Sequence, residues 1–257
     1  MSDTASVPRL AALVTGGAQR IGRAIALALA RAGYGVAVQV RRSRAEADRL
    51  CAEIAASGGR AAVVSADLAD HDAVLRLVPA AAAAVGPLTL LVNNAAEFEP
   101  DEIGRLDRAR FDRHIAVNLR APIFLAEAFA AQAPAGRDGS IVNLLDQRVF
   151  KPTPRFLSYG LAKSALHTAT TTLAQALAPA ILVNAVAPGP TLPSPRQDAD
   201  AFARQVRALP LARGPTPQDI ADAVLYLAGA LSVTGVTITV DGGQHLAWRT
   251  DAAEVEE

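Results

Sequence analysis

The segment "LVTGGAQRIGRAIALALA" at residues 13–30 joins an apolar run to an amphipathic stretch, and it decides the fold class. The apolar residues at 10–14 predict a buried strand, and the stretch that ends at Arg31 predicts a helix. Between them, Gly16, Gly17 and Gly22 allow a tight turn and the close approach of a pyrophosphate, which the helix N-terminus would bind. These glycines could instead serve only a tight connection, but their place at the first strand–helix junction favours a nucleotide site.

The same alternation of strand and helix continues along the chain. Further strands are predicted at residues 35–40, 61–66, 88–92, 140–145, 181–186 and 236–240. Their continuous Val, Ile and Leu runs are typical of strands that are buried on both faces. Seven such strands with helical crossovers predict one Rossmann-type α/β domain over residues 1–257, a doubly wound seven-stranded parallel sheet with helices on both faces. We expect the ends, about 1–7 and 247–257, to be frayed.

Composition excludes several classes of function. The 257 residues have zero formal net charge, 51% hydrophobic and 19% charged residues, which is typical of a globular protein without a nucleic acid or membrane partner. The single cysteine, Cys51, is interpreted as a packed thiol. The N-terminus lacks the pattern of a signal peptide and no apolar run could span a bilayer, so we expect a cytoplasmic protein. No metal site is expected, because metal-ligand spacing is missing among His71, His114, His167 and His245.

The end of the second predicted strand favours NADP(H) over NAD(H). It reads "VQVRRSR" and carries Arg41, Arg42, Ser43 and Arg44 but no acid. A carboxylate at this place would accept from the ribose 2′-hydroxyl of NAD, whereas arginines bind a 2′-phosphate bidentately. The alternative is that these arginines form only a solvated face.

The segment "SYGLAKSAL" carries the strongest catalytic signal. It places Tyr159 and Lys163 four residues apart on one helix face, where a nearby ammonium would lower the pKa of the tyrosine. The alternative is an ordinary amphipathic helix, but only Lys151 and Lys163 among 25 basic residues are lysines. Asp146 stands thirteen residues before Tyr159, at the mouth of a predicted buried strand where an unpaired charge is costly. We expect it to raise the pKa of Tyr159 against Lys163 and keep the phenol protonated for a reduction.

These motifs, in this order over about residues 8–246, resemble the short-chain dehydrogenase/reductase family. "TGGAQRIG" resembles its TGxxxGxG turn with Arg20 in place of the middle glycine, and "NNAA", "YGLAK", "PG" and "VDGG" match its later motifs. An arginine cannot serve this turn as glycine does, so we expect Arg20 to meet a phosphate or the substrate. The resemblance gives Asn118 the role of supporting the lysine through water. It also implies cofactor contacts by Gly16, Arg20, Ile21, Gly22, Arg41, Arg42, Ser43, Asp67, Leu68, Asn93, Ala95, Tyr159, Lys163, Pro188, Gly189 and Thr191.

One departure narrows the resemblance. The family usually has serine where this chain has Asp146, and that exchange, together with Arg20, resembles the pteridine reductases. Phe98 stands where those enzymes stack a pterin, while Ala96 and Glu97 depart from their pattern. The resemblance therefore implies a homotetrameric, NADPH-dependent pteridine reductase. Its catalytic set is Asn118, Asp146, Tyr159 and Lys163, and its substrate contacts are Arg20, Phe98, Asp146 and Tyr159.

Two alternatives stay open. In the first, the protein is a ketone reductase of the same family and Asp146 is incidental. In the second, it is a catalytically silent NADP-binding regulatory protein. The intact set of Tyr159, Lys163 and Asn118 argues against silence, because a silent protein has no need of the lysine.

Overall fold

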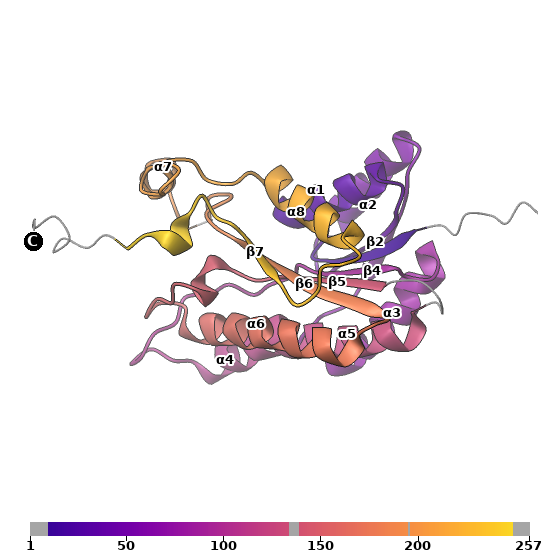
Figure 1. The fold of residues 1–257 in the computed structure, drawn as a ribbon, viewed down its shortest axis with the longest axis horizontal. Helices are drawn as coiled ribbons and strands as arrows, with labels where there is room; N and C mark the ends of the chain where they lie inside the picture. The colour runs from indigo at the N-terminus through magenta and orange to yellow at the C-terminus, as the bar shows by residue number, and fades with distance from the viewer. Residues whose placement is uncertain (1–9, 134–138, 195, 249–257) are drawn as a thin grey trace, which may run out of the picture.

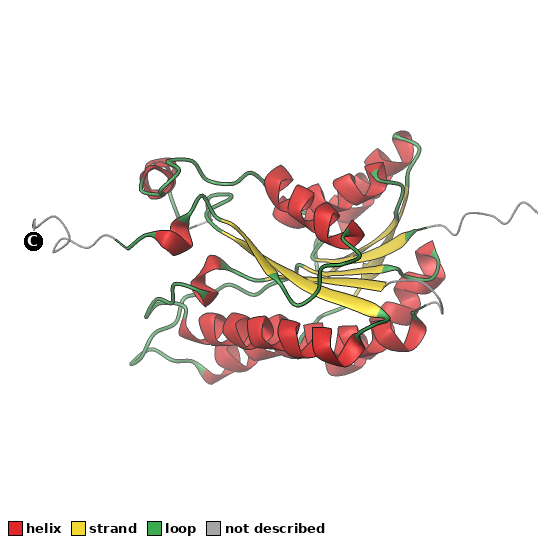
Figure 2. Cartoon of the chain, viewed as in Figure 1, coloured by secondary structure: helices red, strands yellow, loops and turns green. Residues whose placement is uncertain are grey.

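A seven-stranded parallel sheet forms the centre of the molecule and carries helices on both faces (Figures 1 and 2). The computed structural model describes residues 10–133, 139–194 and 196–248. The strands lie in the order β3-β2-β1-β4-β5-β6-β7. Their bounds are β1 Ala11–Thr15, β2 Gly35–Val40, β3 Arg60–Ser65, β4 Leu90–Asn93, β5 Gly139–Leu144, β6 Ile181–Pro188 and β7 Thr237–Val240.

Two helical layers cover the sheet, and β1 shows why they form. Ala11 and Leu13 pack with one layer, whereas Ala12 and Val14 pack with the other, because successive side chains of a strand point to opposite faces. One layer, above the sheet in Figure 1, contains α1 Arg20–Arg31, α2 Arg44–Ala56 and α8 Pro217–Gly229. The other contains α3 His71–Val85, α4 Arg108–Ile115, α5 Ala121–Gln132 and α6 Leu157–Leu177.

Shorter elements complete the fold. A π-helical turn, Ala116–Arg120, joins α4 to α5, and α7 Ala199–Arg207 lies apart from the sheet (Figure 1). The 3₁₀ turns are Gln147–Val149 and Gln244–Leu246.

The predicted fold is confirmed. Each predicted strand is present, and β6 runs two residues beyond its predicted end to Pro188. The predicted frayed ends lie outside the described residues, except for residues 247 and 248. Within the described ranges, no helix is long and apolar enough to cross a membrane.

The strand order also positions the site. β1 lies between β2 and β4, so the chain reverses its winding direction between β1 and β4. Ligands of such sheets bind at the carboxyl ends of the strands near this reversal.

Candidate active site

Two adjoining cavities lie at the carboxyl edge of the sheet. The glycine-turn cavity, lined by the β1–α1 turn and the end of β2, measures about 470 Å³. The tyrosine cavity, lined by Asp146, Tyr159 and Lys163, measures about 730 Å³. Both are lined by Arg20, Ile21, Asn94 and Ala96. The pair therefore forms one continuous site with two chemically different ends.

The β1–α1 turn shapes the first end. Gly16 has a φ of +61°, and a Cβ on Gly22 would lie 2.2 Å from the carbonyl oxygen of Gly16, so both positions require glycine. α1 begins after Gln19, whose side chain makes no capping hydrogen bond to a described residue. The first amides of α1 are thus available to an anion.

The expectation that an arginine cannot serve this turn is wrong. Arg20 adopts a φ of +53°, the left-handed conformation that glycine usually supplies, at a cost of about 1–2 kcal/mol. Its Nη2 donates to the carbonyl oxygens of Leu192 at 3.3 Å and Pro193 at 3.1 Å. The side chain therefore ties the turn to the loop after β6.

Most predicted cofactor residues line the glycine-turn cavity. They are Gly16, Arg20, Ile21, Gly22, Arg41, Arg42, Ser43, Asp67, Leu68 and Ala95. The free amides of α1 together with the four arginines that line this cavity form an anion-binding surface that fits a nucleotide with several phosphates.

One predicted cofactor contact, that of Asn93, is corrected by the structure, whereas the predicted support of Lys163 by Asn118 through water stays a prediction. Within the described lining residues, neither cavity includes Asn93 or Asn118. The Nδ2 of Asn93 donates to the Oδ1 of Asn143 at 2.9 Å inside the sheet. Because successive side chains along a strand point to opposite sides, Asn94 lines the cavity instead. The side chain of Asn118 binds both backbone groups of Glu97, donating to its carbonyl oxygen and accepting from its amide, each at 2.9 Å.

The tyrosine cavity brings together the other predicted residues. The Tyr159 hydroxyl donates to Asp146 Oδ2 at 3.0 Å, and Lys163 Nζ donates to the carbonyl oxygen of Leu144 at 2.6 Å. Lys163 Nζ lies 5.9 Å from the centre of the Tyr159 ring. The remaining predicted residues that line this cavity are Phe98, Pro188, Gly189 and Thr191.

Burial controls protonation here. It raises the pKa of Tyr159 well above its ordinary value, and the Asp146 carboxylate raises it further. Burial lowers the pKa of Lys163 to about 8. The expected upward effect of Asp146 on the Tyr159 pKa is confirmed, but the cation that opposes it is Arg148 rather than Lys163.

Arg148 is a site residue that sequence reasoning missed. Its Nη1 donates to Asp146 Oδ2 at 2.9 Å, and its backbone amide donates to Asp146 Oδ1 at 2.9 Å. The 3₁₀ turn that Asp146 caps brings the guanidinium back onto the carboxylate. An arginine two residues after the acid was the available signal, and the pair removes the cost of an isolated buried charge.

Phe156 is a second missed residue. Its ring stacks on Phe98 with centroids 4.3 Å apart and an angle of 2° between planes. Phe98 also meets the Tyr159 ring edge to face at 4.7 Å. Phe156 has a φ of +60°, which is strained for a bulky residue and typical of functional sites. The cavity therefore has an aromatic wall beside the tyrosine hydroxyl.

Cations lie beside this wall. The Arg148 guanidinium carbon lies 5.3 Å and 5.2 Å from the centroids of Phe98 and Phe156, and that of Arg196 lies 5.6 Å and 6.0 Å away. Both guanidinium groups thus lie within cation–π distance of the two rings.

A buried polar chain supports the start of α6. Asp101 accepts from the Ser158 amide at 3.2 Å and from the Ser158 hydroxyl, and that hydroxyl is 2.5 Å from His114 Nδ1. His114 Nε2 accepts from the Glu99 amide, so the proton of the neutral ring lies on Nδ1. The chain fixes the helix turn that carries Tyr159.

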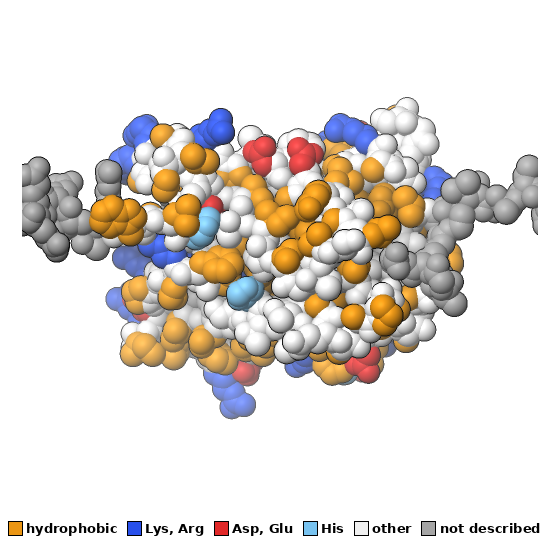
Figure 3. Space-filling view, viewed as in Figure 1, with side chains coloured by type: hydrophobic (Ala, Val, Ile, Leu, Met, Phe, Trp, Pro, Cys, Tyr) orange, Lys and Arg blue, Asp and Glu red, His pale blue; other side chains and the backbone are white. Residues whose placement is uncertain are grey.

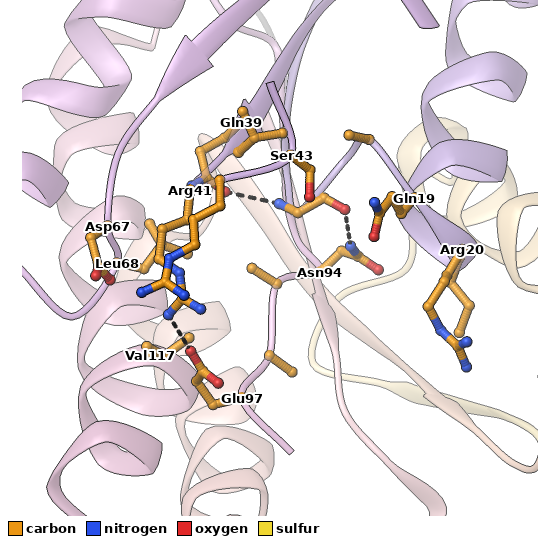
Figure 4. A pocket seen from close by; sticks show the side chains of 18 of the residues that line it. Gln19, Arg20, Gln39, Arg41, Ser43, Asp67, Leu68, Asn94, Glu97 and Val117 are labelled. Atoms are coloured by element: carbon orange, nitrogen blue, oxygen red, sulfur yellow. Dashed lines mark hydrogen bonds and ion pairs between the residues drawn. The ribbon is translucent and has the colours of Figure 1, made fainter. Parts of the chain in front are cut away.

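An ion-pair chain crosses the glycine-turn cavity. Arg41 Nη1 lies 2.6 Å from Glu97 Oε1, and Arg113 Nε lies 2.8 Å from the same oxygen. Arg113 Nη2 then lies 3.2 Å from Asp67 Oδ1. Figure 4 shows the Arg41 side chain directed toward Glu97, with Asp67 nearby and Arg20 apart from this group. Arg113 is a third residue that sequence reasoning missed.

The described residues show no metal centre. They contain no group of three or more His, Cys, Asp or Glu side chains that could hold a metal ion. Cys51 is half-buried in α2, where burial raises the pKa of its thiol.

Comparison with known proteins identifies the family. The family model described as enoyl-(acyl carrier protein) reductase matches residues 16–245. The chain belongs to the short-chain dehydrogenase/reductase family. A 3-oxoacyl-(acyl-carrier-protein) reductase, FabG, from Staphylococcus aureus is 35% identical over 241 residues, which cover 91% of this chain and 98% of the relative.

The chain is also similar to solved structures. FolM alternative dihydrofolate reductase 1 from Brucella canis, complexed with NADP, is 51% identical with a TM-score of 0.91, and the match covers 94% of this chain and 96% of that one. A blue fluorescent protein from a metagenomic library, in complex with NADPH, is 33% identical with a TM-score of 0.85, and the match covers 91% and 97%.

Proposed function

We propose that the protein is a cytoplasmic NADPH-dependent reductase that acts on a pterin. The observation that carries this proposal is the hydrogen bond from Tyr159 to the Asp146 carboxylate beside the aromatic wall of Phe98 and Phe156. A flat heterocycle with N–H donors fits an aromatic face next to a carboxylate acceptor. A simple ketone offers no such donors to Asp146.

The residues of the tyrosine cavity divide the work of a reduction. Bound NADPH would supply the hydride. Tyr159, kept protonated by burial and by Asp146, donates a proton to a ring nitrogen of the substrate. Asp146 accepts from substrate N–H groups, and Arg148 holds the carboxylate in place. Lys163 places a cation close to the phenol.

Two observations support NADP(H) as the cofactor. Arg41, Arg42 and Ser43 line the cavity at the end of β2, where a 2′-phosphate would lie. The similar FolM structure from Brucella canis contains NADP, and the similar metagenomic protein contains NADPH.

The relatives divide between two substrate classes. The FolM structure, at 51% identity, is named for dihydrofolate reduction and favours a pterin or folate. FabG, at 35% identity, is named for reduction of a 3-oxoacyl group and favours ketone reduction, which is our second candidate. Asp146 favours a pterin or folate substrate, because the family usually has a serine at this position and the exchange to aspartate resembles the pteridine reductases.

A homotetramer is part of the proposal. Figure 3 shows hydrophobic side chains gathered over α8 and β7 on one face of the molecule. The exposed apolar residues in and around these elements are Tyr226, Leu231, Val236, Leu246 and Trp248. Exposed apolar patches are a feature of protein–protein interaction sites, so this face is the one that we propose pairs with another copy. Sedimentation of the pure protein tests it, and a monomer at micromolar concentration would exclude this assembly.

NADPH oxidation with matched substrates tests the proposed activity. We expect turnover with dihydrobiopterin, dihydromonapterin or dihydrofolate and little turnover with simple ketones or a 3-oxoacyl thioester. Ketone or thioester turnover without pterin turnover would support the second candidate instead. Binding of NADPH without turnover of any of these substrates would favour a silent binding protein.

A further inference from the structure

Glu97 is the carboxylate at the centre of the ion-pair chain in the glycine-turn cavity. One oxygen, Oε1, meets Arg41 at 2.6 Å and Arg113 at 2.8 Å. Its side chain is 23% exposed, less than the 36% of Arg41 and the 33% of Arg113. An acid thus holds one of the arginines that the 2′-phosphate needs.

The two partners differ in their freedom to move. The backbone amide and carbonyl of Glu97 are both bound by the side chain of Asn118, which is fully buried. Arg41 carries its guanidinium on a long flexible stem at the end of β2. If the pair opens, the Glu97 backbone remains held by Asn118 and its carboxylate remains paired with Arg113, so Arg41 is the partner that moves.

The charges of the cavity decide which interactions a 2′-phosphate changes. Its charged lining residues are Arg20, Arg41, Arg42, Asp67, Glu97 and Arg113. Asp67 and Glu97 both pair with Arg113, whereas Arg42 makes no ion pair with any described residue. A phosphate would therefore meet Arg42 without competition but would compete with Glu97 for Arg41.

We propose that Glu97 is a specificity-determining residue that competes with the cofactor 2′-phosphate for Arg41. This inference rests on the NADP(H) part of the proposed function. Glu97 weakens NADP(H) binding in two ways, because it occupies Arg41 and adds a negative charge to the cavity. It also offers Arg41 a partner as the cofactor leaves, which speeds release. NAD(H), without the 2′-phosphate, does not compete for Arg41.

The test compares wild type with Glu97→Gln, which keeps the size of the side chain and removes its charge. Affinities for NADPH and NADH are measured by fluorescence titration without substrate, and dissociation rates by stopped flow. We expect Glu97→Gln to bind NADPH about two- to fivefold more tightly and release it more slowly, the scale of a partly exposed charge contact. Its affinity for NADH should change by less than twofold.

Two further variants isolate the cause. Glu102→Gln removes a charge five residues further along the chain, where Glu102 lies 3.8 Å from Arg105 and lines neither cavity, so its NADPH affinity should equal that of wild type. In an Arg41→Gln background, Glu97→Gln should tighten NADPH binding by less than it does alone. Melting temperatures verify that each variant folds. If Glu97→Gln does not fold, Glu97→Ala takes its place in the test.

Three results would overturn the inference. Weaker NADPH binding by Glu97→Gln would mean that Glu97 orients Arg41 for the phosphate. If Glu97→Gln changed the affinities for NADH and NADPH equally, Glu97 would act as a general charge in the cavity. If Glu97→Gln tightened NADPH binding as much in the Arg41→Gln background as it does alone, Glu97 would act through a residue other than Arg41. By contrast, a wild-type protein without preference for NADPH over NADH would refute the proposed cofactor itself, and a missing pterin activity would leave these binding results unchanged.

Discussion

The two cavities of the site place their charges in opposite environments. In the glycine-turn cavity, the side chains of Arg41 and Asp67 are 36% and 41% exposed. In the tyrosine cavity, the Asp146 side chain is 15% exposed, and Tyr159 and Lys163 are 5% and 2% exposed. One end of the site is an open ionic surface, and the other is a buried network.

This difference determines what each end can do. Half-exposed ion pairs contribute about 0–1 kcal/mol and are screened by salt, so they can be exchanged for a ligand at little cost. Buried groups have shifted pKa values and fixed positions, which proton transfer requires. Substitutions in the tyrosine cavity should therefore change turnover, and those in the glycine-turn cavity should change cofactor affinity.

Removal of the phenol should have the largest effect. Tyr159→Phe removes the proposed proton donor but keeps the ring that meets Phe98. We expect kcat to fall about 10²- to 10⁴-fold, the usual contribution of a positioned acid, with NADPH affinity unchanged. Steady-state kinetics and fluorescence titration measure the two quantities. A variant that keeps more than a tenth of the wild-type kcat would remove Tyr159 from the mechanism.

The second prediction concerns Asp146. Asp146→Ala removes the acceptor of the Tyr159 hydroxyl and leaves Arg148 without its partner. We expect pterin turnover to fall by about 10²-fold, while NADPH affinity changes by less than twofold. The Asp146→Asn variant keeps an acceptor but no charge, so its pterin turnover should lie between those of wild type and Asp146→Ala. If Asp146→Ala retained most of its pterin activity, the proposed role in substrate binding and protonation would be wrong.

The fold and part of the site could be predicted because their signals are local. Continuous apolar runs report strands, and a spacing of four residues places Tyr159 and Lys163 on one helix face. The contacts of Phe156 and Arg113 arise between segments far apart in the chain, which spacing does not report. Arg20 was misjudged because backbone conformation, and not residue type alone, decides whether a turn forms.

The third prediction reverses the charges at the end of β2. Arg41→Glu combined with Arg42→Glu places two carboxylates where the 2′-phosphate is proposed to lie. We expect NADPH affinity to fall by about 30- to 100-fold and NADH affinity by only a few fold, because like charges repel at short range. Arg44→Glu is the control, since Arg44 pairs with Asp48 on α2 and does not line the cavity. Equal losses of affinity for NADPH and NADH would contradict the proposed binding of the 2′-phosphate by Arg41 and Arg42.

The fourth prediction tests the ion pair inside the tyrosine cavity. Arg148→Ala leaves the Asp146 carboxylate beside Tyr159 without the cation that lowers the tyrosine pKa. We expect kcat to fall by about tenfold and the melting temperature to drop, because one partner of a mostly buried pair is lost. Arg148→Lys, which keeps the charge, should recover part of the kcat and part of the melting temperature. An Arg148→Ala variant with unchanged kcat would limit Arg148 to a structural role.

The smallest effect is expected from the buried chain under α6. Burial lowers the pKa of His114, against the opposing effect of Asp101 and Glu97, so the folded protein holds a neutral ring. As pH falls through about 6.5, the unfolded chain binds a proton at this histidine before the folded protein does. The free energy of unfolding should therefore decrease below this pH, by at most about 1.4 kcal/mol for each unit by which the pKa is lowered. Urea unfolding at pH 7.5 and 5.5 measures the decrease in the free energy of unfolding. This decrease should be smaller in His114→Gln than in wild type. An equal loss in both proteins would assign the acid sensitivity to other groups.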